Sequence, residues 1–149
     1  MRIEVYWIGK TRLPGIAALT AEYGRRLGRY CDFEGLELRP GRRKGARGSE
    51  EETIRERSAG SFRIVMDPEG KRWTSREFSA FLGKLRDQGQ RRISFSVGGA
   101  EGFSPAFREQ ADVLLSLSPL TLPHELARVV LLEQLYRAFA LLANHPYPR

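Results

Sequence analysis

Two hydrophobic periods alternate along this chain, and their alternation constrains the fold more than any other feature of the sequence. Short apolar runs, typical of buried strands, are separated by longer stretches in which apolar residues recur with a helical spacing. The runs predict strands at 2–8, 33–39, 62–67, 92–97 and 112–117. The longer stretches predict helices at about 14–30, from Ser49 onward, from Thr74 to about Gln88, briefly after Ser104, and at about 123–143.

The order of these segments predicts an α/β fold. Strands that alternate with helices, without hairpin signals, typically form a mostly parallel sheet with helices on both faces. No internal repeat, low-complexity tract or linker divides the 149 residues. We therefore expect a single domain over 1–149, long enough to bury roughly 70% of its unfolded surface.

Local signals mark several helix starts. Pro14 suits a first helical turn, where its missing amide proton costs no hydrogen bond. Ser49 is expected to cap a helix whose acidic opening, 50–52, suits the positive end of the helix dipole. Thr74 and Glu77 have the spacing of a capping box.

The chain carries a positive charge that comes mostly from arginine. There are 25 Lys plus Arg against 18 Asp plus Glu, a net charge of +7, and only four of the 25 are lysines. Arginine presents a planar fork of donors to phosphate, so the balance favours a nucleic-acid partner; an arginine-rich genome would give the same composition. The basic loop, 39–47, includes Arg42, Arg43 and Lys44, which we expect to bind RNA phosphates. The alternative is a flexible, solvated run.

The sequence contains no pattern of a membrane span or of an export signal. The apolar stretches are too short and too interrupted by charge to span a bilayer, and MRIEVYWIGK reads as a strand and not as a signal peptide. The single cysteine, Cys31, forms no internal disulfide, in agreement with a reducing compartment. We expect a cytoplasmic protein.

The last predicted helix is apolar around most of its circumference. A surface helix needs only one apolar face, so the excess favours burial on two sides, by its own sheet and by a second copy of the chain. We therefore expect a homodimer. The alternative is a central helix within a monomer.

Motifs for several familiar chemistries are absent. The sequence contains no GxxxxGK[ST] loop, no GxGxxG fingerprint and no serine in a nucleophile elbow. His124 and His145 have no partners at metal-ligand spacing, so we expect no metal site. What remains is a set of loops after strands, the place where ligands bind in open α/β sheets.

Three of these loops should converge if the sheet is parallel. They are the end of the third strand at 66–67, the glycine turn VGGAEG at 97–102, and the proline loop at 117–124. Glycines let a backbone approach a ligand closely, and two prolines make the last loop stiff enough to wrap a flat ring. The alternative is that both segments are a plain turn and a plain connector.

The sequence resembles a known family over essentially its full length. VGGAEGFSP, LSPLTLPHELARVVLLEQLYRA and the ending NHPYPR are similar to the ribosomal RNA large subunit methyltransferase H family, with the last fifty residues or so the most specific part. The resemblance implies the SPOUT class, with a trefoil-knotted carboxyl half and an active site at a dimer interface. It also implies methyl transfer from S-adenosylmethionine to N(3) of a pseudouridine in helix 69 of 23S ribosomal RNA, in assembled ribosomes.

The resemblance also assigns residues to roles. The cofactor-binding positions it implies are Met66, Gly98, Leu117, Ser118, Pro119, Leu120, Thr121 and Leu122. Met66 stands where many relatives have leucine, an exchange that keeps an apolar contact to the adenine.

The reaction itself needs alignment of donor carbon and acceptor nitrogen, and removal of an imide proton. We hypothesise that Arg128 stabilises the imide anion or holds a phosphate, and that His124 or Tyr147 orients the base; the alternatives are a solvated helix face for Arg128 and an ordinary first-turn residue for His124. Pro148 replaces a histidine common in relatives, while Arg149 is expected to meet RNA phosphate.

Two other functions compete with this hypothesis. One is an RNA- or ribosome-binding protein that keeps the fold without the chemistry, and binding of S-adenosylmethionine would exclude it. The other is a SPOUT enzyme that acts on tRNA, against which the lack of an appended RNA-binding domain argues.

Overall fold

The fold is a five-stranded parallel sheet. The computed structural model describes residues 1–39 and 47–147. All paired strands run parallel, in the order β2-β1-β4-β3-β5. The strands are β1 (Arg2–Ile8), β2 (Asp32–Leu38), β3 (Phe62–Arg72), β4 (Arg92–Val97) and β5 (Val113–Ser116). The predicted α/β class with a parallel sheet is confirmed.

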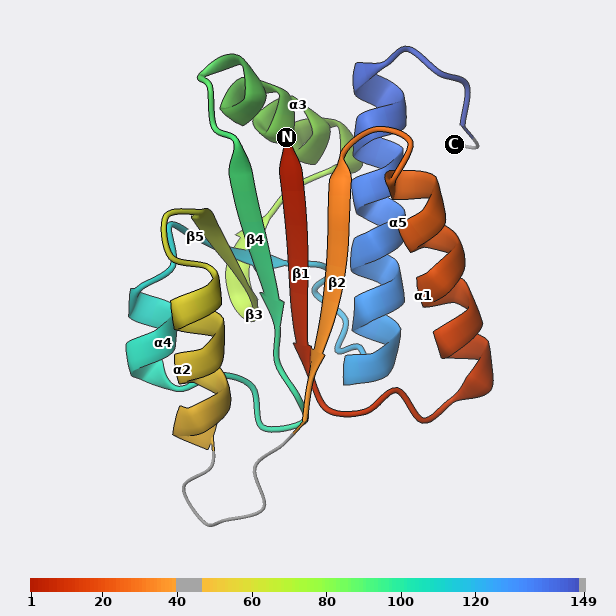
Figure 1. Ribbon diagram of the computed structural model, residues 1–149. Coiled ribbons are helices and arrows are strands. Elements are labelled where there is room, and N and C mark those ends of the chain that lie inside the picture. The colour runs from red at the N-terminus through yellow and green to blue at the C-terminus, as the bar shows by residue number, and fades with distance from the viewer. Residues whose placement is uncertain (40–46, 148–149) are drawn as a thin grey trace.

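Helices cover both faces of this sheet (Figure 1). They are α1 (Pro14–Leu27), α2 (Arg47–Arg57), α3 (Ser75–Asp87), α4 (Pro105–Glu109) and α5 (His124–Leu142). One face packs against α1, α3 and α5, and the opposite face packs against α2 and α4 (Figure 1). Strand β1 is an inner strand, between β2 and β4, and contributes to both layers: Ile3, Val5 and Trp7 join the larger core, and Tyr6 and Ile8 join the smaller one.

Most local signals for helix starts are confirmed. Pro14 occupies the first turn of α1, and the Thr74 side chain accepts a hydrogen bond from the Glu77 amide while Glu77 reaches back to Thr74, which completes the capping box. Ser104 caps α4 through the Phe107 amide. The prediction for Ser49 is wrong, because α2 already begins at Arg47 and places Ser49 inside the helix.

Strand β3 runs further than its apolar run predicts. The sequence places its end at Asp67, but pairing with β5 resumes after an irregularity between Met66 and Lys71 and continues to Arg72. Gly70 explains why the segment can pair: a Cβ at this position would lie 2.6 Å from the Leu114 backbone. The Pro-Glu-Gly sequence is therefore a bulge within the strand.

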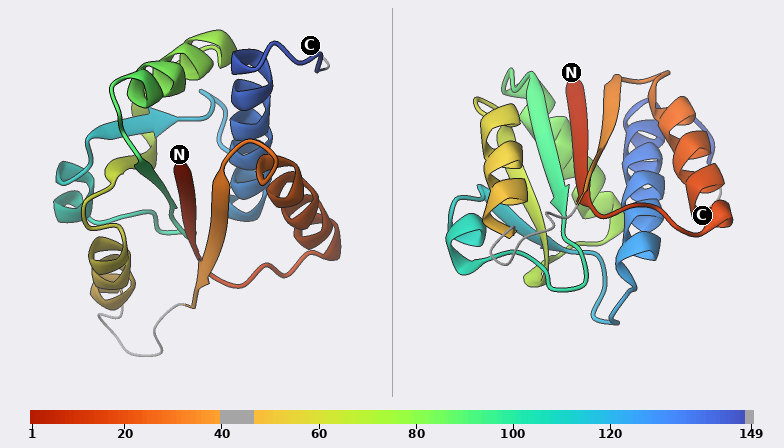
Figure 2. Two further views of the ribbon diagram at one scale, coloured as in Figure 1. Left: turned by 45° about the horizontal axis from the view of Figure 1, so that its top comes forward. Right: turned by 60° about the horizontal axis from the view of Figure 1, so that its bottom comes forward.

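Helix α5 is covered largely by its own chain. It lies against the sheet, with α1 and α3 packed beside it, as both views of Figure 2 show. Leu131, Leu132 and Leu135 are fully buried, whereas Leu126 and Leu141 remain about 40% exposed. The central-helix alternative thus accounts for most of the apolar circumference, and the predicted homodimer rests on the resemblance and on these exposed leucines.

Candidate functional site

A pocket opens at the carboxyl ends of β4 and β5, beside residues 66–68 of β3, where the bulge of that strand begins. Its volume is about 400 Å³, within the range of small-molecule sites. It is lined by Met66, Asp67, Pro68, Val97, Gly98, Gly99, Ala100, Gly102, Leu115, Ser116, Leu117, Ser118, Pro119, Leu120, Thr121, Leu122, Pro123, His124 and Ala127. The predicted convergence of the three loops is confirmed, because the carboxyl ends of parallel strands share one edge of the sheet. All the residues expected to bind the cofactor lie in this lining.

The glycine turn folds back tightly on itself. A Cβ at Gly98 would lie 3.1 Å from Gly102 Cα and 3.4 Å from the Phe103 ring. Gly102 has φ +66°, and its amide donates to the Gly99 carbonyl at 3.1 Å. A side chain at 98 would push the turn apart, so glycine is needed there to keep the backbone at the pocket wall.

The proline loop is stiffened by hydrogen bonds as well as by its prolines. Ser116 Oγ donates to the Ser118 carbonyl at 3.0 Å, and the Leu120 amide donates to Ser118 Oγ at 2.9 Å. Pro123 then precedes α5 directly. Because the loop is fixed at both ends, its backbone presents a preformed wall. Leu120 is 77% exposed on this wall, available to a ligand or a partner.

Asp67 is a charged residue in the lining to which sequence reasoning gave no role. Only 7% of it is exposed, and it accepts hydrogen bonds from the Glu69 amide at 2.8 Å and from Arg108 Nη1 at 3.1 Å. These bonds hold the start of the β3 bulge. In the sequence, the only sign of a role for Asp67 was its place at the end of an apolar run.

His124 is the first residue of α5 and faces the same pocket. The next residue, Glu125, accepts hydrogen bonds from the amides of Arg12 at 2.6 Å and Leu13 at 3.3 Å. The Arg12 amide is the main reason why the pKa of Glu125 is lowered. The first turn of α5 is therefore tied to the loop between β1 and α1.

Arg128 is fully buried, so the solvated helix face considered for it is wrong. Its guanidinium donates to the Ile8 carbonyl at 2.8 Å and to Thr11 Oγ1 at 2.9 Å, and lies 5.9 Å from the centre of the Trp7 ring. Burial lowers its pKa, although the charges of Glu125 and Glu37 oppose that shift. Arg128 is not in the pocket lining, and both of its Nη atoms donate to the protein.

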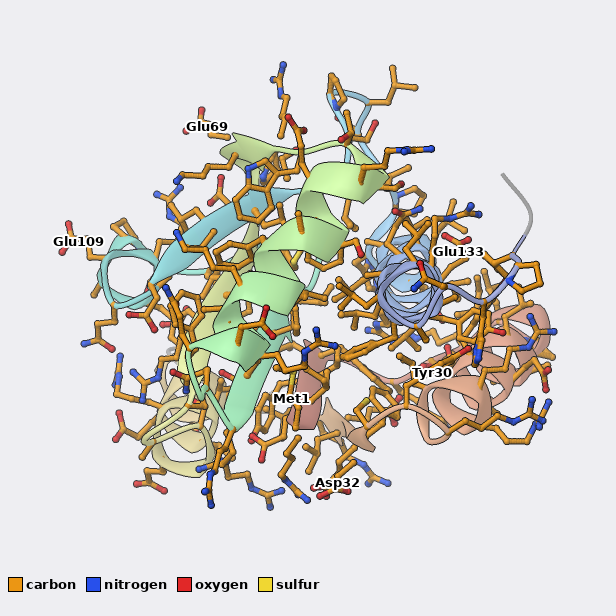
Figure 3. All side chains as sticks on the ribbon, turned by 90° about the horizontal axis from the view of Figure 1, so that it is seen from above. Met1, Tyr30, Asp32, Glu69, Glu109 and Glu133 are labelled. Carbon is orange, nitrogen blue, oxygen red and sulfur yellow. The ribbon has the colours of Figure 1, made fainter. Side chains whose placement is uncertain are left out.

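Tyr147 lies at the other end of α5. It packs on Tyr136, and Arg137 stands 4.7 Å from the centre of its ring. Burial, with a hydrogen bond to Tyr23, raises its pKa. The same region contains Tyr30 and Glu133, which Figure 3 shows on the side of the molecule away from Glu109. Tyr136, on which Tyr147 packs, lies twelve residues along α5 from His124, about 18 Å of helix, so a single chain does not bring these two expected catalytic residues together.

The remaining predicted site residues lie outside the part of the chain that the structure describes. These are Arg42, Arg43 and Lys44 of the basic loop, and Arg149 of the tail; Pro148, the departure from the family pattern, also lies outside it. Within residues 1–39 and 47–147, no group of three or more His, Cys, Asp or Glu side chains could hold a metal ion, and no helix is long and apolar enough to cross a bilayer.

Solved structures of two methyltransferases share this fold. The tRNA (m1G37) methyltransferase of Aquifex aeolicus superimposes with a TM-score of 0.61 at 16% identity, over 100% of this chain and 75% of that one. The SpoU methyltransferase AviRb of Streptomyces viridochromogenes, in complex with AdoMet, gives a TM-score of 0.50 at 16% identity, over 96% of this chain and 58% of that one.

Sequence comparison is more specific. The family described as "Predicted SPOUT methyltransferase" matches residues 1–148. The ribosomal RNA large subunit methyltransferase H of Koribacter versatilis (strain Ellin345) is 42% identical over 151 residues, which covers 99% of this chain and 97% of that protein. The chain therefore belongs to the SPOUT methyltransferases and, within them, to the ribosomal RNA large subunit methyltransferase H family.

Proposed function

We propose that this protein transfers a methyl group from S-adenosylmethionine to N(3) of a pseudouridine in helix 69 of 23S ribosomal RNA, in assembled ribosomes. The observation that carries the proposal is the pocket at the ends of β4 and β5 and the bulge of β3, which is lined by all the cofactor-binding residues that the family resemblance implies. The name of the Koribacter relative supports ribosomal RNA as the substrate, and the net charge of +7 suits an RNA partner.

The lining fits S-adenosylmethionine in shape and in chemistry. Met66 and Leu117 supply apolar surface for an adenine ring, while the glycine turn and the proline loop bring backbone polar groups to the wall. The cradle at Gly98, which a Cβ would fill, lets that backbone approach closely. The related fold of AviRb is known in complex with AdoMet, which supports the same class of ligand here.

The cofactor supplies an already activated methyl group, so the protein needs no covalent nucleophile. Its own residues must orient the uracil ring of the pseudouridine and assist loss of the N(3) proton. We assign this role to His124, because it stands in the lining beside the proline loop. The Asp67 carboxylate, held by Arg108, adds a fixed negative charge to the same wall.

In the position that it occupies here, Tyr147 cannot reach the pocket of its own chain. Because about 18 Å of helix separates His124 from Tyr136, on which Tyr147 packs, the Tyr147 that orients the base must come from a second copy, or the tail must leave its cluster. We therefore propose a homodimer with the active site at its interface. The carboxyl half of each chain would form the trefoil knot of the SPOUT class. The cytoplasm, where assembled ribosomes are found, is the proposed compartment.

Mass spectrometry of RNA after incubation with the protein and labelled S-adenosylmethionine tests this proposal. Assembled ribosomes, free 23S RNA and tRNA are offered in parallel. We expect one methyl group on a pseudouridine of helix 69, and only with assembled ribosomes. Methylation of tRNA instead would favour a tRNA enzyme. Absence of both methylation and cofactor binding would leave an RNA-binding protein without the chemistry.

A further inference from the structure

The structure contains a fully buried arginine next to the pocket but not in its lining. We propose that Arg128 is a positioning residue: it fixes the glycine turn and the first turn of α5 relative to one another by holding the loop between β1 and α1. This inference rests on the proposed function, because it concerns the same pocket. In this role Arg128 does not contact the substrate, in contrast to the hypothesis drawn from the sequence.

The guanidinium joins two points of the β1–α1 loop. Nη2 donates to the Ile8 carbonyl at 2.8 Å, and Nη1 donates to Thr11 Oγ1 at 2.9 Å. Between these points Gly9 has φ +99°, and a Cβ there would lie 3.5 Å from Nη2. The loop thus curves closely around the guanidinium. A planar fork with several donors can reach both acceptors at once, which a lysine ammonium at the same place cannot do as well.

Ile8 connects this arrangement to the wall of the pocket. A Cβ at Gly99 would lie 3.7 Å from the Ile8 carbonyl oxygen and 3.8 Å from Ile8 Cγ2, so the glycine turn rests on the same residue that Arg128 holds. On the other side, His124 and Ala127 precede Arg128 on α5 and line the pocket. Arg128 therefore links two walls of the pocket, the glycine turn and the first turn of α5, through its hydrogen bond to the Ile8 carbonyl.

The surrounding carboxylates extend the network. Thr11 Oγ1, which accepts from Arg128, donates to Glu37 Oε1 at 3.1 Å, and the Thr11 amide donates to the same oxygen at 2.9 Å. Glu125 binds the amides of Arg12 and Leu13, the last residues of the loop. The buried guanidinium thus lies near two carboxylates, Glu37 of β2 and Glu125 of α5, and both accept hydrogen bonds from the β1–α1 loop.

Burial of this charge is difficult to explain by stability alone. Removing a guanidinium from water costs several kcal/mol, and buried ionic groups are often replaceable by apolar residues without loss of stability. The Nε atom is moreover buried without a hydrogen-bond partner among the described residues. An apolar side chain would fill the space at lower cost but would leave the Ile8 carbonyl unheld. The arginine therefore serves to fix the geometry of the pocket, by holding the Ile8 carbonyl beside the glycine turn.

The test compares two matched substitutions of Thr11, because its hydroxyl is the second acceptor of the guanidinium. Thr11→Ser keeps the hydroxyl, whereas Thr11→Val removes it with little change of shape. Calorimetry with S-adenosylmethionine measures the affinity, and thermal unfolding is followed in parallel. We expect Thr11→Ser to bind like the wild type and Thr11→Val to bind at least about three-fold more weakly. Equal affinities for the two variants would overturn the inference.

Arg128→Met and Arg128→Lys test the arginine itself. We expect Arg128→Met to lose about ten-fold or more in cofactor affinity, with Arg128→Lys intermediate, and the double variant of Arg128→Met with Thr11→Val to be no worse than Arg128→Met alone. Ser79→Ala, which removes a buried bond from α3 to the Ala138 carbonyl near the opposite end of α5, controls for lost stability. If Ser79→Ala weakens binding as much at equal stability, the role of Arg128 is merely structural.

The same experiments distinguish failure of the proposed function from failure of the positioning role. A wild-type protein that does not bind S-adenosylmethionine would overturn the proposed function. A wild-type protein that binds it, with an Arg128→Met variant of equal affinity, would overturn only the positioning role. If Arg128→Met does not fold, the Thr11 pair decides.

Discussion

The rings of Tyr136 and Tyr147 meet edge to face, with centroids 4.8 Å apart and planes at 88°. This contact docks the tail on α5, beside a second contact in which Tyr30 and His145 Nδ1 lie 2.7 Å apart. The tail therefore rests on an aromatic surface formed by α1 and α5, far from the pocket of its own chain.

Deletion of 145–149 should separate catalysis from cofactor binding. Because the tail docks at the opposite end of α5 from His124, we expect the truncated protein to bind S-adenosylmethionine with nearly unchanged affinity. We also expect it to lose most of its methylation of ribosomes, since Tyr147 is proposed to orient the base. Calorimetry and incorporation of labelled methyl groups measure the two effects. A truncated protein with intact activity would remove the tail from the site.

Tyr147→Phe provides a finer version of this experiment. The substitution keeps the ring that packs on Tyr136 and removes the hydroxyl, which stands 3.5 Å from Tyr23 Oη. We expect activity to survive if stacking on the base is what the tail contributes. If the variant is as inactive as the truncation, the hydroxyl itself takes part.

Gly98→Ala should damage the pocket with little effect elsewhere. The added Cβ would lie 3.1 Å from Gly102 Cα, closer than backbone normally permits, so the glycine turn must shift. We expect about a ten-fold or greater loss of cofactor affinity and a loss of about 1–3 kcal/mol in unfolding free energy. Gly15→Ala is the matched control, because a Cβ there, in the first turn of α1, meets nothing within 4 Å. Similar affinities for the two variants would contradict the role of the turn.

Much of this fold could be predicted from the sequence, because its signals are local. Apolar runs and the Thr74–Glu77 capping box depend on neighbours within a few residues, and apart from the extension of β3 they lie within a residue or two of where the spacing predicts them. The convergence of the three loops also follows, because parallel strands end at a common edge. These parts needed no knowledge of distant contacts.

The features that sequence reasoning missed depend on distant contacts. Sequence reasoning assigns Arg128 to the imide anion or a phosphate, or else to a solvated helix face, and its burial against the Ile8 carbonyl, 120 positions away, could not be predicted from its neighbours in the sequence. The bulge that extends β3 depends on the fit of Gly70 against Leu114. The docking of Tyr147 depends on α1 and α5 lying side by side. Periodicity and spacing carry no information on such contacts.

Glu4 should give the protein part of its sensitivity to acid. Only 3% of it is exposed, and burial alone would raise its pKa. Hydrogen bonds from Arg2 at 2.8 Å, from Arg92 at 3.0 Å and from Tyr6 at 3.0 Å outweigh burial, so the pKa is lowered from its ordinary value of 4.5. A lowered pKa in the folded state contributes stability above pH 4.5 that is lost as the pH falls through the folded value.

Urea unfolding of Glu4→Gln measures that contribution. We expect the variant to be less stable than the wild type at neutral pH, and the difference to shrink steadily below pH 4.5, the ordinary pKa. Glu34→Gln is the control, because it removes a 44% exposed carboxylate that pairs with the same Arg2, and exposed pairs contribute little. A stability difference for Glu4→Gln that does not change with pH would contradict the assignment.

Substitution of Arg42 and Arg43 by alanine should weaken binding to ribosomes mainly through charge. Both residues lie in the basic loop, outside the described residues, and the prediction rests on their number and spacing in the sequence. Each phosphate contact that is lost should reduce the slope of log affinity against log salt by about 0.7–0.9. We therefore expect weaker binding at low salt and a flatter dependence, with unchanged affinity for S-adenosylmethionine. Arg25→Ala with Arg29→Ala removes the same charge around the end of α1, and should leave the slope close to that of the wild type if the basic loop is the contact. An equal change of slope in both double variants would mean that net charge alone sets the affinity.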